Sequence, residues 1–166
     1  MLGCVVFTAL AMFSLSSVTW VSYRIVRRLR PDEVVFPAMV GMSFIATVNQ
    51  ISAAERGPAM SKFLWRPVVS VSDAGITIWF GWFRPMPGLF LPRTQLARID
   101  EAMIDSPATW IRGDVPGIRL SLAIPNSGLE FTATRAIAVA PIRLRQNQFH
   151  NLYARITTQL RDTTVK

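Results

Sequence analysis

Two long uncharged stretches open the chain, and alternating patterns follow them. Residues 2–23 carry no charged side chain, and a helix of that length covers about 33 Å, enough for a hydrocarbon core of about 30 Å. Residues 34–54 form a second uncharged stretch, and the short link between the two suits a helical hairpin. We therefore expect a membrane anchor over residues 1–54, with one span at 2–23 and a second at 34–54.

Each of the two stretches has an alternative interpretation. The first would be a signal peptide if a charged start preceded the apolar run, but here Arg24 and its neighbours come after it. The second contains Asn49 and Gln50 in its last turn, which lowers its hydropathy. It therefore also fits a re-entrant or buried helix, and a single-pass anchor stays open beside the double-pass one.

Beyond a linker at residues 55–66, the pattern is typical of β-structure. Residues 67–73 and 76–83 read as a hairpin around an Asp-Ala-Gly turn, and Ile118–Ile124 alternate apolar and polar positions before a Pro-Asn-Ser-Gly turn and a returning strand. Residues 146–160 change to a helical period, with apolar positions at Phe149, Leu152, Tyr153, Ile156 and Leu160. Residues 67–166 are expected to form a small antiparallel β-barrel or sandwich closed by a C-terminal amphipathic helix, so the predicted fold class is a membrane-anchored α+β protein.

Composition adds a location and excludes several kinds of chemistry. Of the 166 residues 51% are hydrophobic and 17% charged, and 18 Lys plus Arg against 10 Asp plus Glu give a net charge of +8. The basic residues of the β domain are spaced singly and form no nucleic-acid motif, so no nucleic-acid partner is expected. A basic cluster follows the first apolar stretch at Arg24, Arg27, Arg28 and Arg30. It indicates an inner-membrane protein whose β domain faces the cytoplasm if only the first segment spans, while two spans leave the side open.

Catalytic and metal chemistry find little support. One cysteine and one histidine exclude a disulfide framework and zinc sites rich in cysteine or histidine. His150 has no serine or cysteine motif to partner it, and Asp100, Glu101 and Asp105 lack a calcium-loop pattern, so a solvated edge paired with Arg98 or Arg93 is favoured over a metal site. We predict no catalytic residue, no metal and no cofactor; a membrane-bound hydrolase is a distant alternative.

Aromatic and methionine side chains gather around a Pro-Gly loop. Alternation places Ile76, Ile78, Phe80 and Trp82 on a core face and leaves Trp79 and Phe83 on the other. That other face is either a second buried face or a contact for the membrane or a partner protein. The candidate contact residues are Trp79, Phe83, Arg84, Met86 and Phe90.

The order of these elements resembles that of the bacterial pleckstrin-homology-like domains. The Asp-Ala-Gly-Ile turn at Asp73–Ile76, the Leu91–Asp100 segment LPRTQLARID and the closing helix carry the resemblance, which covers about residues 65–162. The loop from Asp105 to Gly117 departs from the family pattern. The resemblance implies a binding or scaffolding module without catalytic residues.

The expected function is therefore a non-enzymatic, membrane-anchored interaction or scaffold module that binds a protein partner or anionic lipid headgroups at the bilayer surface. Its expected partners are the lipid bilayer and a membrane or membrane-proximal protein, with homo-oligomers left open. The alternative is a small accessory or immunity-type subunit of a membrane complex that acts through its transmembrane helices.

Overall fold

The computed structural model describes residues 19–40, 44, 47–48, 67–81, 83–105, 114–123, 128–135 and 142–161. The described helical residues are 19–29 near the start of the chain, residues 44, 47 and 48, and α3 at Gln146–Arg161 near its end. A short 3-10 turn, η1 (Arg93–Gln95), joins two of the strands. The strands are β1 (Val34–Val40), β2 (Val68–Val71), β3 (Gly75–Phe80), β4 (Met86–Pro92), β5 (Leu96–Asp105), β6 (Asp114–Leu122), β7 (Gly128–Arg135) and β8 (Ile142–Arg143).

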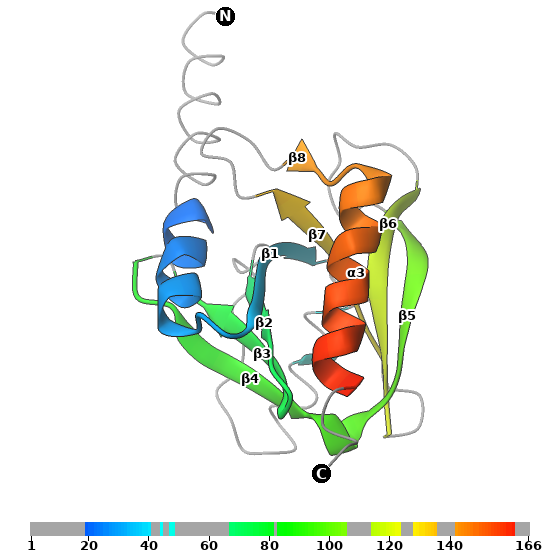
Figure 1. The fold of residues 1–166 in the computed structure, drawn as a ribbon, viewed down its shortest axis with the longest axis horizontal. Coiled ribbons are helices and arrows are strands. Elements are labelled where there is room, and N and C mark those ends of the chain that lie inside the picture. The colour runs from blue at the N-terminus through cyan, green and yellow to red at the C-terminus, as the bar shows by residue number, and fades with distance from the viewer. Residues whose placement is uncertain are drawn as a thin grey trace, which may run out of the picture.

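The strands form two antiparallel sheets that share β1. Their order is β4-β3-β2-β1-β7-β6-β5, with β8 added to β7, and the two sheets face each other across the core (Figure 1). The first half of β1 pairs with β2, with Pro37 opposite Val68, whereas the second half pairs with β7 from Ala38 onward. Because proline has no N–H to donate to a ladder, Pro37 stands where β1 passes from one partner strand to the other.

One apolar core fills the space between the sheets, and α3 covers it. The alternation of the strands supplies the inward side chains, and the helical period of α3 adds three positions on one stripe. The fully buried members include Phe36, Ala38, Val69, Ile76, Ile78, Leu91, Ile118, Leu120, Leu129, Phe149 and Ile156. α3 coincides with the helix predicted at residues 146–160 and ends one residue later, at Arg161.

The helix of residues 19–29 packs on the outer face of the β1–β3 sheet. Val26 is fully buried against Val68 and Trp79, with Tyr23 and Val35 beside them. The Ser22 hydroxyl donates to the Gly81 carbonyl at 2.7 Å, which ties the helix to the end of β3. Residues 19–29 are therefore held by the β domain itself.

These contacts overturn the expected membrane anchor. Residues 34–40 of the second predicted span are not a helix but the strand β1, which pairs first with β2 and then with β7. Residues 2–18 of the first predicted span lie outside the described residues, as does the predicted linker at 55–66. Among the residues that are described, no helix is both long and apolar enough to cross a bilayer. The predicted membrane-anchored fold class and the predicted single-pass or multi-pass inner-membrane location are therefore wrong.

The physical reason is that β1 is covered on both faces. Val34 and Phe36 point into the main core, while Val35 packs against the helix of residues 19–29. A strand buried on both faces is apolar without interruption, which is also the pattern of a membrane span. Pro37, near the start of the second predicted span, lies inside this strand.

Candidate functional site

An open pocket of about 480 Å³ lies between the edge strand β5 and the C-terminal half of α3. We call it the β5–α3 groove. Its apolar part is formed by Leu96 and Ile99 of β5 and Leu160 of α3, which also pack against the main core. Its remaining lining residues are Arg93, Ala97, Arg98, Asp100, Tyr153, Thr157 and Arg161.

The groove is electropositive at its rim. Arg93, Arg98 and Arg161 contribute three guanidinium groups, against the single carboxylate of Asp100. The Arg98 Nε lies 2.6 Å from the Asp100 Oδ1, and the Arg98 side chain is 74% exposed. Because an ion pair this exposed is worth only about 0.2–1 kcal/mol, Arg98 can exchange its partner for a ligand carboxylate at little cost.

The two edges of the strand path differ in how open they are. β4 carries Pro87 and Pro92, and a proline in an edge strand removes a backbone donor and blunts pairing with another chain. β5 runs for ten residues, Leu96–Asp105, without a proline. Its register with β6 shifts between Leu96 and Arg98 and is regular from there on. Among the described strands, β5 is therefore the edge better suited to accept a further strand.

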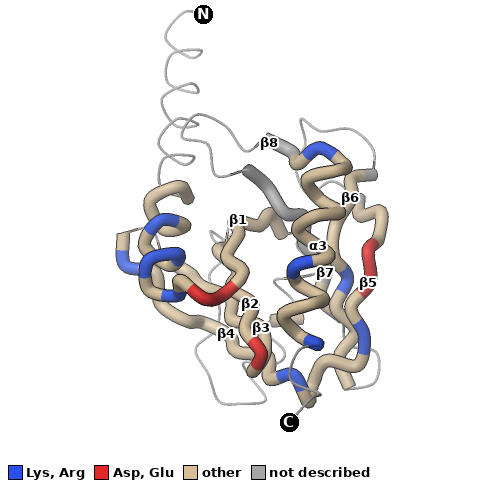
Figure 2. Tube along the Cα trace, in the orientation of Figure 1, with Lys and Arg blue, Asp and Glu red and all other residues tan. Residues whose placement is uncertain are grey.

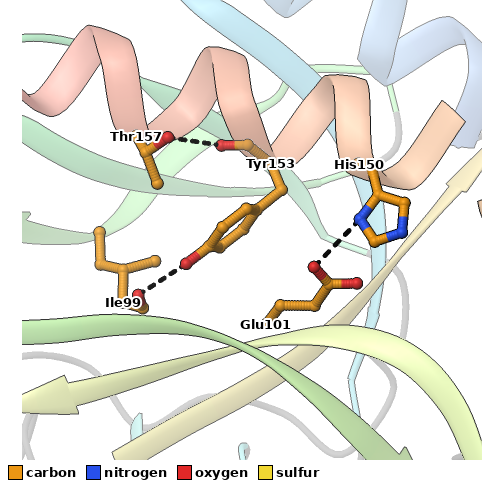
Figure 3. A network of polar contacts seen from close by, with 5 residues as sticks. All are labelled: Ile99, Glu101, His150, Tyr153 and Thr157. Carbon is orange, nitrogen blue, oxygen red and sulfur yellow. Dashed lines mark hydrogen bonds and ion pairs between the residues drawn. The ribbon is translucent and has the colours of Figure 1, made fainter. Parts of the chain in front are cut away.

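Side chains of α3 reach across to β5 beside the groove. The Tyr153 hydroxyl donates to the Ile99 carbonyl at 2.9 Å, and the His150 Nδ1 lies 3.1 Å from the Glu101 Oε2 (Figure 3). The Tyr153 ring is stacked with Phe149, with their centroids 6.5 Å apart. The Thr157 hydroxyl donates to the Tyr153 carbonyl one turn back along the helix. These contacts fix the distance between α3 and the strand that form the two walls.

The His150–Glu101 pair was not predicted from the sequence, because the two residues are 49 positions apart and no motif links them. A histidine oriented by a carboxylate is one part of a general-base system, but such a system also needs a nucleophile within hydrogen-bond reach. No contact of His150 with a serine, threonine or cysteine side chain occurs in the described part of the chain. The pair joins α3 to β5.

The acidic group predicted from the sequence is divided by the strand. Asp100 pairs with Arg98 and Glu101 with His150, so the two neighbouring carboxylates have separate partners. Asp105 is the last residue of β5. Among the residues described, no group of three or more His, Cys, Asp or Glu side chains is arranged to hold a metal ion.

The aromatic residues predicted as a contact surface separate into two groups. Trp79 is only 5% exposed, and its Nε1 donates to the Ser70 hydroxyl at 2.9 Å, so it belongs to the buried face under the helix of residues 19–29. Phe83, Met86 and Phe90 are exposed, by 68%, 67% and 47%. Arg84 is exposed as well. None of the five lines the groove.

The basic cluster lies on and just after the helix of residues 19–29, on the opposite side of the molecule from β5 (Figure 2). The Arg24 guanidinium stacks over Trp20, with 4.7 Å to the ring centroid, and the Arg27 Nη1 donates to the Tyr23 hydroxyl. Arg30 pairs with Glu33 and lies over the Trp79 ring. Arg28 is exposed beside them. Of the predicted juxtamembrane arginines, Arg30 thus contacts the β domain, through Trp79, whereas Arg24 and Arg27 contact residues of their own helix.

No model of a known protein family matches the sequence, and a comparison with curated proteins finds no significant relative.

Proposed function

We propose that this chain is a non-enzymatic interaction module that binds an extended, acidic segment of a protein partner in the β5–α3 groove. The observation that carries the proposal is the coincidence of a proline-free edge strand with a groove whose rim has three arginines against one aspartate. Added strands bind through backbone hydrogen bonds, and the side chains around the edge decide which sequences are accepted.

The geometry of β5 specifies the ligand's pattern. Ile99 packs against the core below the groove, whereas the neighbouring Arg98 is exposed on the other side of the strand. A strand added along this edge would alternate in the same way, because successive side chains of a strand point to opposite faces. The ligand is therefore a segment that alternates apolar and acidic residues.

The resemblance to the bacterial pleckstrin-homology-like domains is part of the same proposal. Two antiparallel sheets and a C-terminal helix that covers their core support it. It implies a binding or scaffolding module, in agreement with the non-enzymatic function proposed from the groove. The alternative of an accessory subunit acting through transmembrane helices is not carried forward, because its premise is contradicted by the strand β1.

The test is a binding assay with a defined probe. A fluorescein-labelled peptide of eight alternating Glu and Val residues, the Glu-Val peptide, is titrated with the protein, and fluorescence anisotropy gives the Kd. The matched Gln-Val peptide measures what the charges add. We expect saturable binding of the Glu-Val peptide, weaker binding of the Gln-Val peptide, and weakening of the first by added salt.

Two variants locate the binding site. Arg93→Gln and Arg98→Gln should each raise the Kd of the Glu-Val peptide about 1.5- to 5-fold, since each removes one exposed charge pair. Arg28→Gln removes the same charge from the helix of residues 19–29 and should leave the Kd unchanged. Equal weakening by all three variants would show a diffuse charge effect and contradict the proposal. So would binding to vesicles of anionic lipid with no binding of the peptide.

A further inference from the structure

The backbone of β5 has a defined outward side. In an antiparallel pair the N–H and C=O of one residue point to the same side, and this side alternates along the strand. Pro116 of β6 lies opposite Met103, and a proline cannot take part in a pair that exchanges both hydrogen bonds. The N–H and C=O of Met103 therefore point away from β6. Ile99 is four residues from Met103 in an unbroken register, so its backbone groups have the same orientation. The N–H and C=O of Ile99 therefore point away from β6, toward the open edge.

The Tyr153 hydroxyl already occupies this edge. It donates to the Ile99 carbonyl at 2.9 Å, in the position where the N–H of an added strand would donate (Figure 3). Tyr153 also lines the β5–α3 groove. We infer that the Tyr153 hydroxyl competes with the ligand for the Ile99 carbonyl. A bound strand displaces the hydroxyl from this acceptor, and the competition sets the affinity of the groove. The inference rests on the proposed function.

Displacement of the hydroxyl is compatible with an intact fold. The phenolic oxygen is fixed to the ring, so the Tyr153 side chain turns away as a whole and its stack with Phe149 shifts, whereas the Tyr153 carbonyl keeps the hydrogen bond from Thr157. The released hydroxyl faces an open pocket, where water can satisfy it. The exchange therefore breaks one hydrogen bond in the protein and forms one with the ligand, while Phe149, Ile156 and Leu160 keep α3 packed on the core.

The same contact explains how the edge is protected when no ligand is bound. Unpaired edge strands are templates for pairing with other chains, and proteins block them with prolines, charges or covering elements. β4 has its prolines, whereas β5 has a single hydroxyl over Ile99 and the His150–Glu101 pair beside it. A block made of one hydrogen bond is reversible.

The inference is tested with Tyr153→Phe, which removes the hydroxyl and keeps the ring. Because one hydrogen bond no longer competes, we expect the Glu-Val peptide to bind this variant about two- to tenfold more tightly than the unmodified protein. The matched control is Tyr23→Phe, which removes the other tyrosine hydroxyl of the chain from the helix of residues 19–29 and should leave the Kd unchanged. Circular dichroism checks that both variants fold.

A second measurement reads the edge directly. Hydrogen exchange of the Ile99 and Glu101 amides should slow when the Glu-Val peptide saturates the protein, because both point to the added strand. An unchanged or weaker affinity in folded Tyr153→Phe overturns the inference, and so does unchanged exchange at both amides. If the unmodified protein binds the peptide with the expected arginine dependence, the proposed function survives that result. If no protein binds the peptide, the proposed function and the inference both fail.

Discussion

Removing the one carboxylate of the β5–α3 groove should improve its affinity for an acidic ligand. In Asp100→Asn, Arg98 loses the partner that lies 2.6 Å away and becomes available to a ligand carboxylate. The Arg98 side chain is 74% exposed and that of Asp100 28%, so solvent screens the pair and its net worth is about 0.2–1 kcal/mol. In the variant, Arg98 gains a similar free energy from its pair with the ligand carboxylate. The Kd of the Glu-Val peptide should therefore fall about 1.5- to 5-fold.

The cost to stability is correspondingly small. Asp100 also lies opposite Arg119 of β6, so the substitution weakens one cross-strand pair of opposite charges. A loss of about 1 kcal/mol lowers the Tm of a domain this size by about 2–4 °C, which sets the upper limit expected in a thermal melt. Asp73→Asn, an exposed change in the turn between β2 and β3, is the control. Equal or weaker binding by Asp100→Asn would refute the reasoning, as would an equal gain for the uncharged Gln-Val peptide.

Two further predictions concern the sheet that supports the helix of residues 19–29. Ser70→Ala leaves the buried Trp79 N–H without its hydroxyl acceptor and should lower the free energy of unfolding, measured in urea, by about 1–3 kcal/mol. Trp79→Phe should lower the free energy of unfolding less in the Ser70→Ala background than in the unmodified protein, and additive losses would contradict a direct bond. Gly75→Ala places a Cβ against the Leu91 carbonyl at a φ of +151°, a conformation that L side chains rarely adopt. It should lower the free energy of unfolding by about 1–3 kcal/mol, and an unchanged Tm would disprove that strain.

Local patterns predicted the elements that are half-buried. The apolar residues of α3 recur with a helical period because one stripe of the helix faces the core, where Phe149, Ile156 and Leu160 are buried. The strand β6 alternates in the same informative way, with Ile118 and Leu120 inside and Arg119 exposed. In both elements the solvent face supplies the contrast that makes the period readable.

The pattern of β1 predicts a membrane span wrongly, because the strand has no such contrast. Its sequence from Val34 to Val40 is apolar throughout, since one face meets the main core and the other the helix of residues 19–29. The signals that favoured a strand were local: three valines, which are common in strands, and Pro37 in the middle, which a helix interior does not tolerate. The hydropathy of the whole stretch, residues 34–54, favours a membrane span in spite of these local signals.

The groove itself was beyond the reach of sequence patterns. Arg98 and Asp100 were expected to pair, but nothing in the chain indicated that Tyr153 and Leu160, which follow much later in the sequence, would lie across from them. The pattern favoured the aromatic residues as the contact surface, but Trp79, the largest of them, is buried under the helix of residues 19–29. A site made by a helix crossing the edge of a strand depends on tertiary packing, which periodicity does not encode.

The most direct test is to map where the Glu-Val peptide binds. Isotope-labelled protein is titrated with the peptide, and the backbone amide shifts are followed by NMR. Saturable shifts should centre on Leu96–Glu101 of β5 and on Tyr153–Arg161 of α3, and leave the helix of residues 19–29 unmoved. Shifts centred on β4 or on that helix, or none that saturate, would contradict binding in the β5–α3 groove.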